Sequence, residues 1–118
     1  MKYKFGDFLR QQREALRKKD RRFSLRQVAT RIGIQPSHLS KLERGEEVYL
    51  SERKIIALAK DLNVEPDILL AMSGKVSSDI QEIIKKRPEL FGQLIRELKK
   101  MPDNAILRIV REVRDGEW

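Results

Sequence analysis

The chain has 118 residues, with 26 basic and 18 acidic side chains and a formal net charge of +8. This length fits one domain, or a small domain with an appendage. With no cysteine and a single histidine, the chain excludes disulfides, thiolate metal sites, iron–sulfur clusters and sites built from several histidines. No apolar run approaches the roughly 18 residues of a membrane span, and the first residues lack the apolar core of a signal peptide. We therefore expect a cytoplasmic protein with no membrane contact.

The positive charge is unevenly distributed. Residues 1–44 carry 13 basic and 4 acidic side chains, a net charge of +9, whereas residues 45–118 carry 13 and 14, a net charge of −1. A basic third joined to a nearly neutral remainder predicts a surface for an anionic partner and a second part with another task. The alternative is an ordinary solvated face whose charges happen to be positive.

Apolar residues recur at helical spacing along the chain, and no stretch alternates with a period of two, which predicts an all-α fold of about eight helices. A first helix is predicted over about 5–16. The second follows the capping box Ser24–Gln27 and ends at Gly33, where a left-handed residue is expected. Pro36 suits the first turn of a third helix, which Gly45 closes.

The remaining elements are also predicted to be helices. Ser51 is the expected cap of a strongly apolar fourth helix, and Pro66 opens a short fifth one. The small, polar segment 73–78 is the best candidate for a linker, so we expect domains at 1–73 and 74–118. Three further helices are predicted beyond it, with Pro88 and Pro102 at the starts of the last two.

The segment Leu25–Arg44 has the pattern of a helix-turn-helix. Ala29 is small where two helices would press together, Gly33 suits the turn, and Leu39 would pack into the angle between the helices. The other inward positions are apolar: Val28, Ile32, Ile34 and Leu42. The outward positions of the second helix are all polar: Gln35, Ser37, His38, Ser40, Lys41 and Arg44. This pattern favours recognition of DNA.

At these residues the chain resembles the lambda-repressor/Cro-like (XRE) helix-turn-helix regulators. The resemblance covers about residues 5–72, and the run Leu42-Glu43-Arg44-Gly45 after a helix-turn-helix is specific to this pattern. Further matching segments are 9–15, 23–29, 33–45 and 55–59. The resemblance implies a five-helix lambda-repressor-like DNA-binding domain, whose third helix enters the major groove, with about three appended C-terminal helices. It also implies a transcriptional regulator. The sequence contains no metal-binding constellation, no Gly-rich phosphate loop and no specific Ser/His/Asp set, so we expect no enzyme and no cofactor or metal.

The resemblance also assigns roles to individual residues. Side chains expected to touch base edges are Gln35, Pro36, Ser37 and Lys41; Gln pairs well with adenine, and Lys with guanine. Contacts to the DNA backbone are expected from Ser24, Leu25, His38, Ser40, Arg44, Arg53, Arg21 and Arg22. Arg13 and Glu43 match a pair that is usually structural, an ion pair linking the first and third helices.

Two departures from the family pattern affect these assignments. The segment 16–22 is several residues longer than the usual loop and mostly basic. Either the first helix is longer, or a basic loop reaches toward phosphates, and we favour DNA contact slightly. The acidic pair Glu46-Glu47 directly follows the recognition helix and would repel phosphate, which puts backbone contact by residues 46–50 in doubt.

The last 45 residues lie outside the resemblance. Their apolar residues, which recur at helical spacing, favour dimerisation through Leu94, Leu98, Ile106, Ile109, Val110 and Val113. Docking of a different protein, ligand sensing and an extension of the core are the alternatives. We therefore expect a homodimeric repressor that reads an inverted repeat in double-stranded DNA. The alternative is an antitoxin- or controller-type adaptor whose main partner is a protein and which binds DNA for autoregulation.

Overall fold

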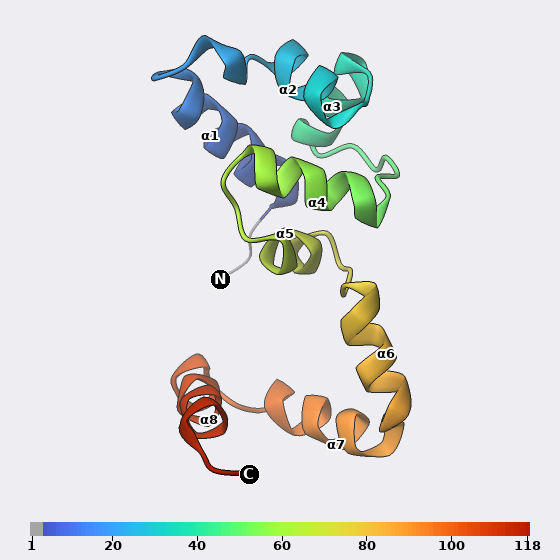
Figure 1. The fold of residues 1–118 in the computed structure, drawn as a ribbon, viewed down its shortest axis with the longest axis vertical. Coiled ribbons are helices and arrows are strands. Elements are labelled where there is room, and N and C mark those ends of the chain that lie inside the picture. Colours follow the sequence, from blue (N-terminus) through green and yellow to red (C-terminus); the bar gives the residue numbers. More distant parts are fainter. Residues whose placement is uncertain (1–3) are drawn as a thin grey trace. The chain divides into compact units, whose positions relative to one another are not determined.

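The computed structural model describes residues 4–118, and over that range the fold contains helices and no strand (Figure 1). The all-α prediction is confirmed. The chain divides into two compact units, the first ending at Ser77 and the second spanning Ser78–Trp118. The point of division lies in the segment 73–78, whose composition predicts a linker.

The first unit contains five α-helices and one short 3-10 turn. The turn, η1 (Arg21–Phe23), lies between the first two helices. The α-helices are α1 (Phe5–Arg17), α2 (Leu25–Ile32), α3 (Pro36–Glu43), α4 (Glu52–Asp61) and α5 (Pro66–Met72). Packing joins α1 to α3, α2 to both α3 and α4, and α4 to α5.

Local chemistry explains where these helices begin and end. The Ser24 hydroxyl accepts the Gln27 N–H at 3.3 Å and caps α2, and Ser51 caps α4 in the same way. Gly33 ends α2 in the left-handed region with a φ of +79°, which favours glycine because that conformation strains a residue with a Cβ. Pro36 is the first residue of α3, where no intrahelical N–H is needed.

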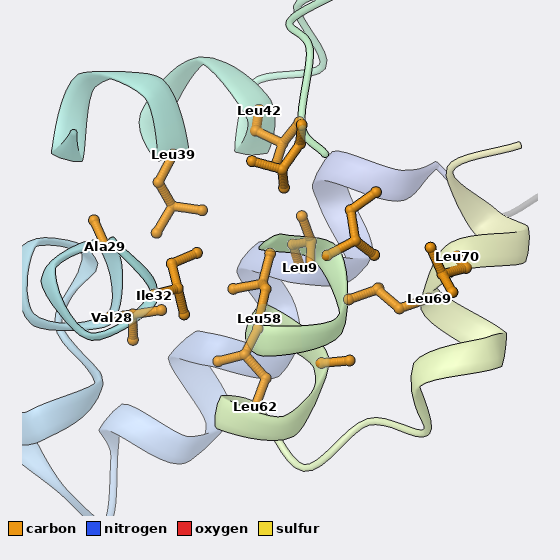
Figure 2. Packing of buried hydrophobic residues seen from close by; sticks show 13 residues of the cluster. Leu9, Val28, Ala29, Ile32, Leu39, Leu42, Leu58, Leu62, Leu69 and Leu70 are labelled. Carbon is orange, nitrogen blue, oxygen red and sulfur yellow. The ribbon is translucent and has the colours of Figure 1, made fainter. Parts of the chain in front are cut away.

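The first unit has one hydrophobic core, to which all five helices contribute (Figure 2). Leu39 of α3 lies beside Ala29 and Ile32 of α2 in Figure 2, so the two helices of the helix-turn-helix are held at their angle by direct packing. The buried apolar residues are Leu9, Val28, Ala29, Ile32, Leu39, Leu42, Leu50, Ile55, Leu58, Ala59, Leu62, Leu69 and Leu70.

The start of α1 approaches the end of α3 very closely. Gly6 is buried, and a Cβ at this position would fall against the backbone carbonyl oxygens of Leu42 and Glu43. Backbone atoms cannot rotate away as a flexible side chain can, so glycine allows the two helices to meet here. The end of α3 is therefore fixed directly to α1.

The second unit consists of α6 (Ser78–Lys86), α7 (Pro88–Lys99) and α8 (Asp103–Asp115). No residue of 78–118, all of which the structure describes, is buried. Large apolar side chains on α7 and α8, among them Leu94, Val110 and Val113, are about half exposed. Across residues 4–118 no helix combines the length and apolar character needed to cross a membrane.

Candidate nucleic-acid interface

The turn between α2 and α3 is fixed by its own backbone and by a lysine from α4. The Ile34 N–H donates to the Ala29 carbonyl at 3.0 Å, across Gly33. The Lys54 ammonium donates to the Ile32 carbonyl at 3.0 Å and occupies the space that a Cβ at position 33 would enter. These bonds satisfy carbonyls at the end of α2 and set the direction in which α3 begins.

The recognition helix α3 has a buried face and an exposed face. Leu39, Leu42 and Glu43 are buried against the first unit. Ser37, Lys41 and Arg44 are exposed, and their i, i+4, i+7 spacing places them along one side of the helix. The helix therefore presents a polar stripe to solvent while its opposite side is locked into the core.

The four residues that are expected to touch bases lie together, on α3 and at its N-terminus. Gln35 is the N-cap residue of α3 and its side chain makes no capping hydrogen bond. Gln35, Ser37 and Lys41 are exposed, whereas Pro36 is half-buried in the first turn. The amide of Gln35 and the ammonium of Lys41 have the hydrogen-bonding groups that read base edges in the major groove.

Several side chains expected at the DNA backbone have partners within the protein. The Arg44 guanidinium donates to the Ser40 hydroxyl at 2.8 Å and forms an ion pair with Glu46 at 2.7 Å. Both charged groups are about half exposed, so such a pair contributes only about 0–1 kcal/mol. A DNA phosphate could therefore displace the Glu46 carboxylate at low cost.

Arg13 and Glu43 form a buried ion pair between α1 and α3. The Arg13 guanidinium donates two hydrogen bonds to the carboxylate, at 2.7 and 2.9 Å, and a third to the Phe23 carbonyl at 3.2 Å. Arg13 is 4% exposed and Glu43 5%. The hydrogen bond to Glu43 raises the pKa of Arg13, although burial opposes this shift. This pair belongs to the fold, as the resemblance implies, and is not available to DNA.

The basic insertion forms a loop with one 3-10 turn, since α1 ends at Arg17. Asp20 caps this turn and accepts hydrogen bonds from the Arg22 side chain and backbone N–H, which lower the pKa of Asp20 to about 2. The ionised Asp20 therefore offsets the charge of Arg22. Lys18, Lys19 and Arg21 are exposed and form no ion pair within residues 4–118.

The remaining expected backbone contacts lie at the starts of two helices. Ser24 caps α2 through its hydroxyl oxygen, and Leu25 is the first residue of that helix, so backbone N–H groups of the first turn face outward from the helix end. Arg53 is exposed in the first turn of α4. It forms no ion pair with any residue of 4–118.

Three interacting residues near the expected interface were not predicted from the sequence. Arg31 forms an ion pair with Asp61 at 2.7 Å, and its guanidinium lies 5.0 Å from the centre of the Phe23 ring. Tyr49 is 77% exposed, and its carbonyl accepts a hydrogen bond from His38 at 2.8 Å. Lys75 donates to the Leu50 carbonyl. The hydrogen-bonded pairs lie 11 to 30 residues apart in sequence, where no periodic pattern connects them.

Comparison with known proteins identifies the family to which the chain belongs. A family model described as helix-turn-helix matches residues 10–69, which include α2, the turn and α3. No curated protein and no solved structure matches the chain significantly. The matched range covers half of the chain and all the residues placed on the recognition helix. The chain therefore belongs to the lambda-repressor-like (XRE) helix-turn-helix family of DNA-binding regulators.

Proposed function

We propose that this chain is a homodimeric transcriptional repressor that reads an inverted repeat in double-stranded DNA. The exposed polar stripe on α3 carries this proposal, because the opposite side of the same helix is fixed by Leu39, Leu42 and the Arg13–Glu43 pair. A rigid helix can place its side chains against base edges reproducibly. Occupation of an operator that overlaps a promoter would then block polymerase.

The proposed contacts separate specificity from general affinity. Gln35, Pro36, Ser37 and Lys41 would face base edges, and discrimination would come from Gln35 and Lys41. The phosphates would be held by the start of α2, by exposed arginines and by two half-buried polar side chains of α3, His38 and Ser40. The full set is Ser24, Leu25, His38, Ser40, Arg44, Arg53, Arg21 and Arg22. The excess of basic residues in 1–44 supports salt-dependent attraction to any DNA sequence.

Selection of bound duplexes from a random library at physiological salt tests this function. We expect enrichment of an inverted repeat, with half-sites about one helical turn, 10–10.5 base pairs, apart. Enrichment of a single half-site would contradict dimeric reading. A folded protein that enriches no sequence would overturn the proposed function.

Lys41→Ala should weaken binding to the selected site by about 1–3 kcal/mol and relax the preference at one base pair, because an ammonium that donates to a base edge is lost. Titration of labelled duplexes with the selected and the permuted base would measure both effects. Lys60→Ala is the matched control, since Lys60 is an exposed lysine at the far end of α4 and should leave affinity unchanged. An equal loss on random DNA would mean that Lys41 contacts only phosphate.

The second unit supports dimerisation. A unit of 41 residues is close to the size below which a chain usually needs metals, disulfides or association to fold, roughly 40 residues. Its 9 basic and 8 acidic residues nearly balance, so two copies would not repel each other. Gly92, Ile95 and Leu98, together with the side chains of Arg96 and Lys99, line a shallow groove on α7, and the space above Gly92 is open to a neighbouring helix. The proposed contact residues are Leu94, Leu98, Ile106, Ile109, Val110 and Val113.

Replacing both Ile106 and Val110 with Glu should yield monomers, because two carboxylates would have to be desolvated in the proposed contact. Light scattering across a concentration series measures the mass. The matched control is the double change Arg108→Glu with Arg111→Glu, since these residues lie on the other side of α8 and should leave the dimer intact. A dimer that survives Ile106→Glu with Val110→Glu would exclude α8 as the main contact.

The same exposed apolar residues favour a second candidate, an adaptor whose main partner is another protein and which binds DNA for autoregulation. The mass of the unmodified chain separates the two. A monomer at micromolar concentration that nevertheless binds a single half-site would favour the adaptor. A stable dimer would favour the repressor.

A further inference from the structure

The segment between α3 and α4, residues 44–51, contains no helix or strand, yet two side chains from outside it hold successive carbonyls. His38 of α3 bonds to the Tyr49 carbonyl at 2.8 Å. Lys75 donates to the Leu50 carbonyl at 2.5 Å, and its ammonium lies 4.9 Å from the centre of the Tyr49 ring. His38 of α3 therefore holds Tyr49, and Lys75 holds both Tyr49 and Leu50.

Both contacts are chemically well defined. A carbonyl oxygen can only accept, so the His38 Nε2 must carry the hydrogen in this bond. The Lys75 bond is charge-assisted, and the face of the Tyr49 ring attracts the same ammonium. The Leu50 side chain is 5% exposed, so it anchors the segment in the core while its carbonyl accepts the bond from Lys75.

Lys75 is itself held in place by the end of α5. Its backbone N–H donates to the Leu70 carbonyl at 2.8 Å, and the preceding N–H, that of Gly74, donates to the Ala71 carbonyl at 2.9 Å. Leu70 is buried in the core of the first unit. The Lys75 side chain thus reaches the segment 44–51 from a backbone that is itself fixed. Its bond to the Leu50 carbonyl therefore restricts the movement of this segment.

We propose that Lys75 is a positioning residue for DNA recognition. It fixes Tyr49 and Leu50, and through the Tyr49 carbonyl and His38 it restricts the recognition helix and the start of the 44–51 segment, where Arg44 lies. The inference rests on the proposed DNA-binding function, but Lys75 itself need not touch DNA. Its ammonium serves the Leu50 carbonyl and the Tyr49 ring within the protein.

The experiment compares Lys75→Met, which keeps the length of the side chain and removes its charge, with the unmodified chain. NMR relaxation would report the backbone order of residues 46–50, and titration at several salt concentrations would report affinity for the selected duplex. We expect lower order in this segment and an affinity about 3- to 30-fold weaker. The slope of affinity against salt should be unchanged, since no phosphate contact is lost.

Three further measurements make the result decisive. Lys75→Arg should restore order and affinity, because a guanidinium can also donate to the carbonyl and stack on the ring. Lys60→Met should change neither quantity. The effects of Lys75→Met and His38→Ala on the backbone order of residues 46–50 should not add in the double variant, because both side chains hold this one segment.

Contrary outcomes are distinguishable from one another. A salt slope reduced by about 0.9 for Lys75→Met would mean that Lys75 binds a phosphate directly and would overturn the positioning role. Unchanged order in 46–50, or unchanged affinity, would also overturn it. Failure of the unmodified chain to bind any duplex would instead overturn the proposed function, whereas the order of 46–50 would still report whether Lys75 holds the segment.

Discussion

Arg13→Met is expected to lower the free energy of unfolding by about 3–5 kcal/mol, because it leaves the Glu43 carboxylate buried without its partner. Glu43 is 5% exposed and receives two hydrogen bonds from the Arg13 guanidinium. The same change removes the donor to the Phe23 carbonyl, which ties η1 to α1. Urea denaturation followed by circular dichroism would measure the loss.

A double variant separates two contributions to the free energy of unfolding: the destabilisation by an unpaired buried charge and the stabilisation by the ion pair itself. Arg13→Met combined with Glu43→Leu should recover much of the lost stability, since both buried charges are then gone. Arg10→Met on the exposed side of α1 is the control and should cost little. Equal destabilisation by Arg13→Met and Arg10→Met would contradict a structural role for the pair.

Leu39→Ala is expected to lower the free energy of unfolding by about 2–5 kcal/mol, through lost apolar burial and the cavity left behind. Leu39 is fully buried between α3 and α2, beside Ala29 and Ile32 (Figure 2). Because this side chain sets the angle of the recognition helix, specific DNA binding should weaken as well. Thermal unfolding and titration of the selected duplex would measure the two effects.

The control for Leu39→Ala is a similar truncation at an exposed site of the same unit. Ile68 on α5 is 54% exposed, so Ile68→Ala should cost far less than Leu39→Ala. A similar loss of stability at both positions would show that Leu39 does not hold the two helices together. Loss of stability without loss of specific binding would contradict its role in placing α3.

The helix-turn-helix could be predicted because its determinants are local. The Ser24 cap, the positive φ at Gly33 and the position of Pro36 each depend on a few neighbouring residues. The inward positions follow from helical spacing, and apolar residues at these positions, such as Val28 and Leu39, are fully buried. The Arg13–Glu43 pair joins residues 30 apart and came from the family resemblance instead.

Contacts between elements could not be predicted, because no spacing rule connects their members. Arg31 meets Asp61 across 30 residues, and Lys75 meets Leu50 across 25. Every residue has a backbone carbonyl, so the identity of Leu50 gives no sign in the sequence that a lysine bonds to it. The basic insertion differs from these contacts, because its turn is closed locally: the Asp20 side chain caps η1 and accepts the Arg22 N–H two residues along the chain. Its composition left a longer α1 as an alternative to the loop, with DNA contact slightly favoured.

Because no residue of 78–118 is buried, the proposed dimer would make DNA binding depend on the concentration of the chain itself. In the proposed homodimer, a unit with so little internal packing would gain most of its folding free energy from the partner copy, so its order would follow mass action. Where dimers are scarce their number rises as the square of the chain concentration, and doubling the chain raises it about fourfold. An operator that requires the dimer would thus respond more steeply to synthesis and degradation than one bound by a monomer.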